Sequence, residues 1–393
     1  MPRRTVNKIL EQAYERGLAA AAHGEVATYI PELSKANPLD LGISLCLPDG
    51  TRYEIGDVEK RFTIQSISKV ISLGCAIQRC GAKAVFSKVG MEPSGEAFNS
   101  LVELDLRTSR PLNPMINSGA ITVASLLKEV MTFNEFMDVT RKVCNDPDID
   151  FNEAVYRSEK EHLSRNRSIA YLLESKGIIT TGVEESLDFY TKMCSMNVTA
   201  RSLASLGVTL AMDGQDPFTG EQLFPVRTAE IVKTIMLTCG MYDSSGEFAV
   251  FVGIPTKSGV GGGLLSAADD RIGIGVYGPS LDEKGNCIAG RPVLELLSEE
   301  LELHIFDKTD VMDEIRKAEA RDRAVAKINQ KIRDGITGGA GAAGENGANG
   351  ASGAADGNGD GAETDDSKVS IRTLRHKGAR TFMPFNVKDK DKE

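Results

Sequence analysis

A serine and a lysine stand three positions apart in the apolar segment RFTIQSISKVISLGCAIQRCG, residues 61–81. Residues three apart on a helix share a face, so Ser66 and Lys69 are expected to point the same way. Burial among the flanking aliphatic residues would lower the pKa of the lysine, because desolvation disfavours its charged form. A neutral lysine can take the proton of an adjacent serine hydroxyl and so activate a nucleophile. The pattern alone leaves a second interpretation open, a surface lysine at the end of a buried stripe.

A second motif lies late in the chain, where Lys257, Ser258 and Gly259 form a K-[ST]-G triplet. S-x-x-K combined with a late K-T-G is found in serine β-lactamases and penicillin-binding proteins. There the strand forms the wall opposite the serine, and its glycine lets a substrate lie close to the backbone. The amide of Val260 could then act as an oxyanion donor beside the amides of the helix start. The alternative is a glycine-rich hairpin, which the following glycines would explain by themselves.

The remaining motifs carry less information. A second S-x-x-K, Ser125 and Lys128, has a charged neighbour and resembles an ordinary helix edge. The triplet Ser195–Asn197 completes the three-motif pattern only on paper, because short matches are frequent. GIGVYG at 273–278 matches a dinucleotide fingerprint, but Pro279 follows and no helix can open there. The four histidines lie away from the serine motif, which disfavours a Ser-His-Asp triad and a metal site; they are His23, His162, His304 and His376.

The elements that must position these residues follow from periodicity. A helix is expected over residues 5–22, and LGISLCLPDGTRYEIGD gives two strands around a turn at 48–50. Residues 66–240 are mostly helical patterns, and three strands follow in FAVFVGIPTKSG, GGLLSAAD and RIGIGVYGP. RPVLELLSEELELHIF then closes with a helix. This order predicts an α+β fold, in which helices flank an antiparallel sheet built from both chain ends and an all-helical subdomain is inserted between them.

Composition and charge narrow the class of protein. The chain has 393 residues and a formal net charge of -10, which argues against nucleic acid or an anionic membrane as a general partner. No apolar run is long enough to span a bilayer, and the N-terminus lacks the apolar core of a signal peptide. Seven irregularly spaced cysteines without C-x-x-C favour reduced thiols. A cytoplasmic protein is expected.

The C-terminal part differs in composition from the rest. One large domain is expected over residues 1–310, with the helical subdomain at about 70–200, followed by a charged helix at 311–335. Residues 336–367 are rich in Gly, Ala, Asn and Asp, and are expected to be a disordered linker because they cannot bury enough apolar surface. Residues 368–393 form a short basic and apolar tail, either a docking peptide or a frayed end.

Seven segments together resemble the serine-dependent glutaminases, the bacterial and kidney-type enzymes with a β-lactamase-like or penicillin-binding-protein-like fold. The resemblance covers roughly residues 5–308, and its segments occur in the family's order. They are VATYIPEL (26–33), QSISK (65–69), NPMINSGAI (113–121), SEKEHLSRNRSIAYLL (158–173), LDFYTKMCS (187–195), CGMYDSSGEFA (239–249) and KSGVGGG (257–263).

The resemblance implies hydrolysis of L-glutamine to L-glutamate and ammonia through a γ-glutamyl ester, without a cofactor. By matching motif, Ser66 is the nucleophile, Lys69 its base and Tyr242 a proton relay, and the amides of Ser66 and Val260 form the oxyanion hole. A carboxylate suits the substrate's ammonium, and neutral donors suit its carboxylate. The implied substrate-binding set is Tyr29, Gln65, Ser66, Asn117, Glu159, Asn166, Tyr190, Tyr242 and Val260.

Two other readings remain, a β-lactam-recognising serine hydrolase of the same fold and a non-catalytic interaction protein. The absence of an export signal disfavours the first, and the intact Ser66, Lys69 and Tyr242 disfavour the second. The resemblance further implies a homodimer or homotetramer.

Overall fold

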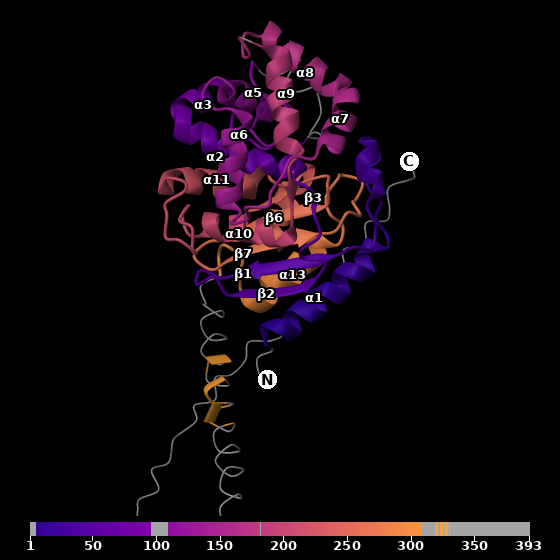
Figure 1. Ribbon diagram of the computed structural model, residues 1–393, viewed down its shortest axis with the longest axis vertical. Helices are drawn as coiled ribbons and strands as arrows, with labels where there is room; N and C mark the ends of the chain where they lie inside the picture. Colours follow the sequence, from indigo (N-terminus) through magenta and orange to yellow (C-terminus); the bar gives the residue numbers. More distant parts are fainter. Residues whose placement is uncertain are drawn as a thin grey trace, which may run out of the picture. The chain divides into compact units, whose positions relative to one another are not determined.

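A computed structural model describes residues 5–95, 109–180 and 182–307, together with scattered residues between 319 and 330 (Figure 1). The chain divides into two compact units, residues 1–331 and 332–393, and all described residues belong to the first. The expected linker and tail at 336–367 and 368–393 lie outside the described residues.

A five-stranded antiparallel sheet combines strands from both ends of this unit, in the order β2-β1-β7-β6-β5. Leu45 of β1 pairs with Tyr53 of β2 on one side and with Ile274 of β7 on the other. The expected assembly of the sheet is therefore confirmed. The strands are β1 (Gly42–Cys46), β2 (Arg52–Gly56), β5 (Thr256–Ser258), β6 (Gly263–Ala268) and β7 (Ile272–Tyr277).

Two terminal helices cover one face of the sheet, α1 (Val6–Ala21) and α13 (Gly290–Leu301). Side chains alternate between the faces along each strand, so Ile274 and Val276 reach the core shared with these helices. Figure 1 shows both helices beside β1 and β2, at the end of the molecule away from most helices.

The other face of the sheet is covered by α10 (Ala200–Ala211), which approaches unusually closely. A Cβ atom on Gly273 or Gly275 of β7 would overlap the backbone of α10, and one on Gly207 would overlap Ser266 O of β6. Glycine at these positions brings helix and sheet backbones into direct contact. This closeness fixes α10 and the segments next to it against the rigid sheet.

The remaining helices are inserted between β2 and β5, as expected, and α5 to α9 gather at the end of the molecule opposite β2 (Figure 1). All of them except α7 and α12 contribute to one hydrophobic core, which includes Val70 of α2 and Met236 of α11. The helices are α2 (Ser68–Cys80), α3 (Ala82–Lys88), α5 (Asn117–Leu127), α6 (Phe133–Val143), α7 (Glu153–Glu161), α8 (Ser164–Ser175), α9 (Val183–Cys194), α11 (Val226–Cys239) and α12 (Ser245–Phe251).

Short elements join this helical block to the sheet. A two-stranded ribbon pairs β3 (Phe62–Thr63) with β4 (Asn197–Val198), and three 3₁₀ turns occupy η1 (Pro31–Lys35), η2 (Gln65–Ile67) and η3 (Tyr242–Ser244). Two of these turns, η2 and η3, contain residues with candidate catalytic roles.

One expected strand is partly wrong. FAVF, at 248–251, forms the end of helix α12, and strand β5 begins only at Thr256. Phe248 and Val252, four positions apart, both reach the core beneath the sheet, and this helical spacing outweighs the β propensity of the segment.

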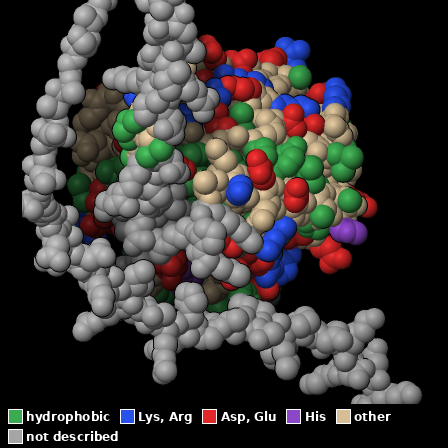
Figure 2. Space-filling view, turned by 90° about the horizontal axis from the view of Figure 1, so that it is seen from below, with side chains coloured by type: hydrophobic (Ala, Val, Ile, Leu, Met, Phe, Trp, Pro, Cys, Tyr) green, Lys and Arg blue, Asp and Glu red, His purple; other side chains and the backbone are tan. Residues whose placement is uncertain are grey.

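The described residues of the expected helix at 311–335 are helical, and Tyr53 on β2 donates a hydrogen bond to Glu319 Oε2 (2.5 Å). On the face shown in Figure 2, acidic and basic side chains are interspersed. None of the described helices combines the length and apolarity that a bilayer crossing requires.

Candidate functional site

Ser66 lies in the turn η2, between strand β3 and helix α2, and exposes 6% of its surface. The preceding Gln65 has a left-handed backbone with φ of 47°. A non-glycine residue in this region costs about 1–3 kcal/mol and persists where the surroundings impose it. The Ser66 hydroxyl is hydrogen-bonded to the side chain of Tyr242.

Lys69 is almost completely buried one turn later, with 1% exposure, which excludes the alternative of a surface lysine. Its amine donates to Met115 O (3.1 Å) and to Asn117 Oδ1 (2.8 Å). Burial lowers the pKa of Lys69 to about 8, although Cys194 and Glu159 act to raise it. An amine in this state is neutral often enough to accept a proton.

The K-S-G segment lies directly against the serine turn. A Cβ on Gly259 would lie 3.0 Å from Ile64 O, and one on Gly261 would overlap Thr63 O. Val260 between them is buried and packs in one cluster with Tyr242. The segment therefore passes beside Ser66, as a wall opposite the nucleophile requires, and is not an isolated hairpin.

Tyr242 is the second strained residue at this point, with φ of 55° in the turn η3. Its hydroxyl donates to Ser258 O (3.2 Å), and the Ser245 hydroxyl donates to Tyr242 O (2.8 Å). Burial raises the pKa of Tyr242 above its ordinary value, so the phenol stays protonated at neutral pH. A protonated phenol beside Ser66 can donate a proton, but it is a poor base.

A chain of neutral side chains extends from Lys69 into the helical block. Asn117, the first residue of α5, accepts from Lys69 and from the Tyr190 hydroxyl (3.4 Å) through its Oδ1. Its Nδ2 donates to Asn166 Oδ1 on α8 (2.9 Å). Three helices, α5, α8 and α9, thereby bring amide and phenol groups to one place.

Glu159 on α7 is buried, and its Oε2 has no hydrogen-bond partner among the described residues. Burial raises its pKa to about 7, although a hydrogen bond from Gln65 and the charge of Lys69 act to lower it. Tyr29 exposes 53% of its surface, but its hydroxyl end is buried near Tyr242 and Glu159, and its pKa is raised well above the ordinary value by burial first and by these groups. An unpartnered buried carboxylate is costly unless a cation completes it.

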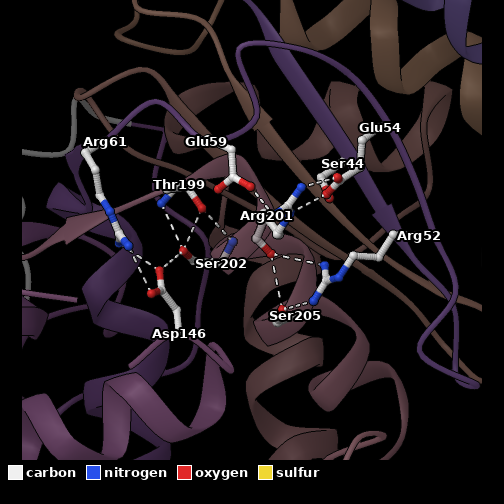
Figure 3. A network of polar contacts seen from close by, with 10 residues as sticks. All are labelled: Ser44, Arg52, Glu54, Glu59, Arg61, Asp146, Thr199, Arg201, Ser202 and Ser205. Atoms are coloured by element: carbon white, nitrogen blue, oxygen red, sulfur yellow. Dashed lines mark hydrogen bonds and ion pairs between the residues drawn. The ribbon is translucent and has the colours of Figure 1, made fainter. Parts of the chain in front are cut away.

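A polar network next to α10 holds the approach to the serine turn (Figure 3). Asp146 accepts two hydrogen bonds from Arg61 and one from Ser202 at the start of α10. Arg201 pairs with Glu54 of the sheet in the same region. Because Arg61 immediately precedes β3, these contacts fix the strand that leads to Gln65 and Ser66.

Comparison with known proteins identifies the chain. The family model described as Glutaminase matches residues 24–306. The chain belongs to the glutaminase family. The Clostridium botulinum (strain Hall) protein named glutaminase is 52% identical over 305 residues, which is 77% of this chain and all of that protein. Glutaminase 2 of Clostridium perfringens is 50% identical over the same shares.

Solved glutaminase structures agree. A probable glutaminase from Bacillus subtilis, complexed with 6-diazo-5-oxo-L-norleucine, has a TM-score of 0.70 and 38% identity over 78% of this chain and 99% of that one. A covalent complex of the Bacillus subtilis enzyme with 5-oxo-L-norleucine has a TM-score of 0.70 and 39% identity, over 76% of this chain and 99% of that one. The expected fold class is thus confirmed.

In this glutaminase the structure brings some of the sequence motifs together around Ser66 and leaves others outside the site. Every expected site residue lies in the region just described. The second S-x-x-K has no such setting, since the Ser125 hydroxyl donates to Thr122 O and Lys128 pairs with Glu129. The Ser195 hydroxyl likewise donates within its own helix, to Thr191 O.

Sequence reasoning treated Lys257 as part of a strand and missed its place in the glutaminase site. Its amine is fully buried, lies 4.4 Å from the centre of the Tyr242 ring, and donates to Gly240 O (3.2 Å) and Ser258 O (2.5 Å). Burial, with the nearby Lys69, lowers the pKa of Lys257 well below its ordinary value. The K-S-G motif predicted the strand, but nothing in the sequence predicted that the Lys257 amine would lie over the Tyr242 ring.

Proposed function

We propose that this glutaminase hydrolyses L-glutamine to L-glutamate and ammonia through a γ-glutamyl ester on Ser66. The observation that carries the proposal is the environment of the serine. A hydroxyl bonded to a protonated phenol lies one turn before a lysine whose pKa is about 8. These are the acid and the base that an acyl transfer to serine needs, and histidine is not required.

The amino-acid end of glutamine is recognised by the unpartnered carboxylate and the neutral donors around it. Glu159 Oε2 receives the substrate's ammonium, which supplies the missing cation. Asn117, Asn166 and the hydroxyls of Tyr29 and Tyr190 surround the carboxylate end. Amides that lack either end are rejected, because these buried groups would then remain unpaired.

In the first half of the reaction, Ser66 Oγ attacks the side-chain amide carbon and its proton passes to neutral Lys69. The carbonyl oxygen becomes negative and is held by the amides of Ser66 and Val260. Tyr242 donates its proton to the leaving nitrogen, the C–N bond breaks, and ammonia leaves. The proton held by Lys69 then passes to the Tyr242 phenolate, so both groups regain their starting protonation states.

In the second half, water attacks the γ-glutamyl ester and gives a proton to Lys69. The C–O bond to Ser66 breaks, the serine oxygen regains the proton, and glutamate is released. The same base and the same oxyanion donors serve both halves, because each half passes through a tetrahedral oxyanion at the same carbon.

The covalent complex reported for the Bacillus subtilis enzyme supports the proposal. The bound 5-oxo-L-norleucine is formed from 6-diazo-5-oxo-L-norleucine. It shares the amino-acid end of glutamine and carries a carbonyl carbon where glutamine has its amide carbon. A relative at 39% identity therefore forms a bond with a molecule of this shape.

The test compares two serines in matched S-x-x-K motifs. Ser66→Ala is expected to abolish ammonia release from L-glutamine and labelling by 6-diazo-5-oxo-L-norleucine, followed as a mass increase of the intact protein. Ser125→Ala, in the second motif, should retain both. Substantial turnover by Ser66→Ala would overturn the assignment of the nucleophile.

Two further properties follow as proposals. All seven cysteines are within the described residues and have free thiols, which supports the cytoplasm as the site of action. We also propose a homodimer or homotetramer, which light scattering of the purified chain would distinguish from a monomer.

A further inference from the structure

We propose that Asp188 is a positioning residue that holds helix α7 against helix α9 and thereby sets the affinity for the substrate's amino-acid end. The inference rests on the proposed function, because it takes Glu159 and Tyr190 as groups that bind glutamine. Asp188 itself lies outside that set, on α9.

The contacts of Asp188 connect the two helices directly. The Tyr156 hydroxyl of α7 donates to Asp188 Oδ1, and Lys160 of α7 donates both to that oxygen (3.3 Å) and to the Tyr156 hydroxyl (2.8 Å). Lys192, one turn further along α9, pairs with Asp188 Oδ2 (2.7 Å). Both carboxylate oxygens are therefore engaged, and one of them bridges the helices.

The bridge lies within one helical turn of both substrate-binding side chains. Tyr156 precedes Glu159 by three positions, so the two share the buried face of α7. Asp188 precedes Tyr190 by two positions on α9. A shift of Tyr156 relative to Asp188 would therefore move Glu159 relative to Tyr190 by a comparable amount.

Glu159 depends on such external support because its own contacts are few. Its Oε2 has no partner, and Gln65 supplies the hydrogen bond to its side chain. Helix α7 spans only nine residues, a length at which helices need tertiary contacts to persist in a fixed position. The Tyr156–Asp188 contact is such a support.

The charges around Asp188 favour the bridge. Burial acts to raise the pKa of Asp188, but hydrogen bonds from Lys192 and Tyr156 outweigh it and leave the pKa below its ordinary value. The ring of Tyr156 is flanked by the amines of Lys160 (5.1 Å) and Lys192 (6.0 Å) and packs on Phe151 (5.3 Å).

The outer side of the bridge faces a hollow of about 900 Å³, lined among others by Tyr156, Lys160, Asp188 and Lys192. Removing an oxygen or a charge here therefore leaves no sealed cavity, and Asp188→Asn and Tyr156→Phe are expected to fold. This makes the bridge accessible to a clean kinetic test.

The test measures kcat and KM for L-glutamine and the inhibition constant of L-glutamate in Asp188→Asn, Tyr156→Phe and the double variant. Each single variant is expected to raise KM and the glutamate inhibition constant in parallel by about tenfold, since hydrogen bonds to charged groups are worth roughly this factor. The value of kcat should change less than about threefold. The double variant should be no worse than Asp188→Asn alone, because the contact with the Tyr156 hydroxyl is one of those that Asp188→Asn weakens.

Matched controls separate this effect from a general loss of charge or hydroxyl. Asp138→Asn breaks an exposed ion pair with Arg141 inside α6, and Tyr171→Phe removes a hydroxyl bonded to exposed Glu184. Neither control should alter KM.

A lowered melting temperature of Asp188→Asn with unchanged KM would overturn the proposal, because the bridge would then be structural only. A double variant whose KM exceeds that of Asp188→Asn by the full factor of Tyr156→Phe would also overturn it. Glu159→Gln tests separately whether Glu159 binds the substrate. If this variant leaves KM unchanged, the proposed binding site is wrong. If Glu159→Gln raises KM but Asp188→Asn does not, only the role of the bridge is refuted.

Discussion

Protonation of Lys69 is expected to control the rate of the chemical step, and burial determines where the change occurs. The lysine acts as a base only when neutral, so activity is present above its pKa and is lost as the pH falls through it. Burial brings this pKa from the ordinary 10.5 to about 8. Raising the pH from 6 to 10 is therefore the informative perturbation.

The size of the effect follows from this value. With a pKa of about 8, about half of the lysines are neutral at pH 8, about one in ten at pH 7 and about one in a hundred at pH 6. The value of kcat should rise about tenfold between pH 6 and 7 and level off near pH 9. An ordinary lysine would leave only about one in 300 neutral at pH 8.

Glu159 adds a second ionisation that affects binding. Its pKa is about 7 in the empty site, and it must be ionised to hold the substrate's ammonium. Below pH 7, kcat/KM should thus fall more steeply than kcat, by about a hundredfold per unit against about tenfold, because two protons must be lost.

The assay follows ammonia release at saturating and at low L-glutamine across this range. Samples returned to pH 8 should regain full activity, which shows that the protein stayed folded. A kcat that keeps rising tenfold per unit up to pH 10 would show an ordinary lysine. A kcat independent of pH from 6 to 9 would remove Lys69 from the role of base.

Three substitutions test other parts of the structure. Tyr242→Phe should lower kcat for glutamine by about 10²–10⁴ but affect the γ-methyl ester of glutamate much less, since that leaving group needs less protonation; equal losses would contradict an acid role. Lys257→Met should leave the fold intact, as measured by circular dichroism, while lowering kcat about tenfold through a less fixed Tyr242 ring, whereas unchanged kcat would show the amine to be dispensable. Gly207→Ala should destabilise the protein by about 1–3 kcal/mol in urea unfolding, because its Cβ would overlap Ser266 O, and an unchanged midpoint would show that α10 can move away from the sheet.

Much of the fold could be predicted from the sequence because local patterns agree with it. The hairpin around residues 48–50 and the late strands show the alternation and the turn residues of a sheet. The two terminal helices that cover the sheet, α1 and α13, are amphipathic. The strand predicted for FAVF was wrong because a short apolar run shows no clear periodicity. The packing of this segment in the core decides that it is helical.

The site was less predictable. Ser66 and Lys69 share one helix start, so their spacing alone brings them together. Glu159 and Tyr190 lie on helices that read as ordinary surface helices, and only the resemblance to the family singled them out. Lys257 contacts the Tyr242 ring because the K-S-G strand packs against the turn that contains Tyr242. A contact between segments so far apart in the chain cannot be predicted from the local sequence of either segment.

The pairing of β1 with β7 constrains how the chain can fold during its synthesis. Leu45 has no sheet partner in Ile274 until about 230 further residues have been made, which takes roughly 10–45 seconds at 5–20 residues per second. During that time the edge of β1 that later pairs with β7 stays unpaired, and α1 lacks α13. The helical block, whose core is made of nearer neighbours, can form first. A ribosome that stalls before β7 would therefore leave the unpaired edge of β1 exposed beside a folded helical block. Such an edge can pair with another chain and aggregate, and the synthesis of β7 removes this possibility.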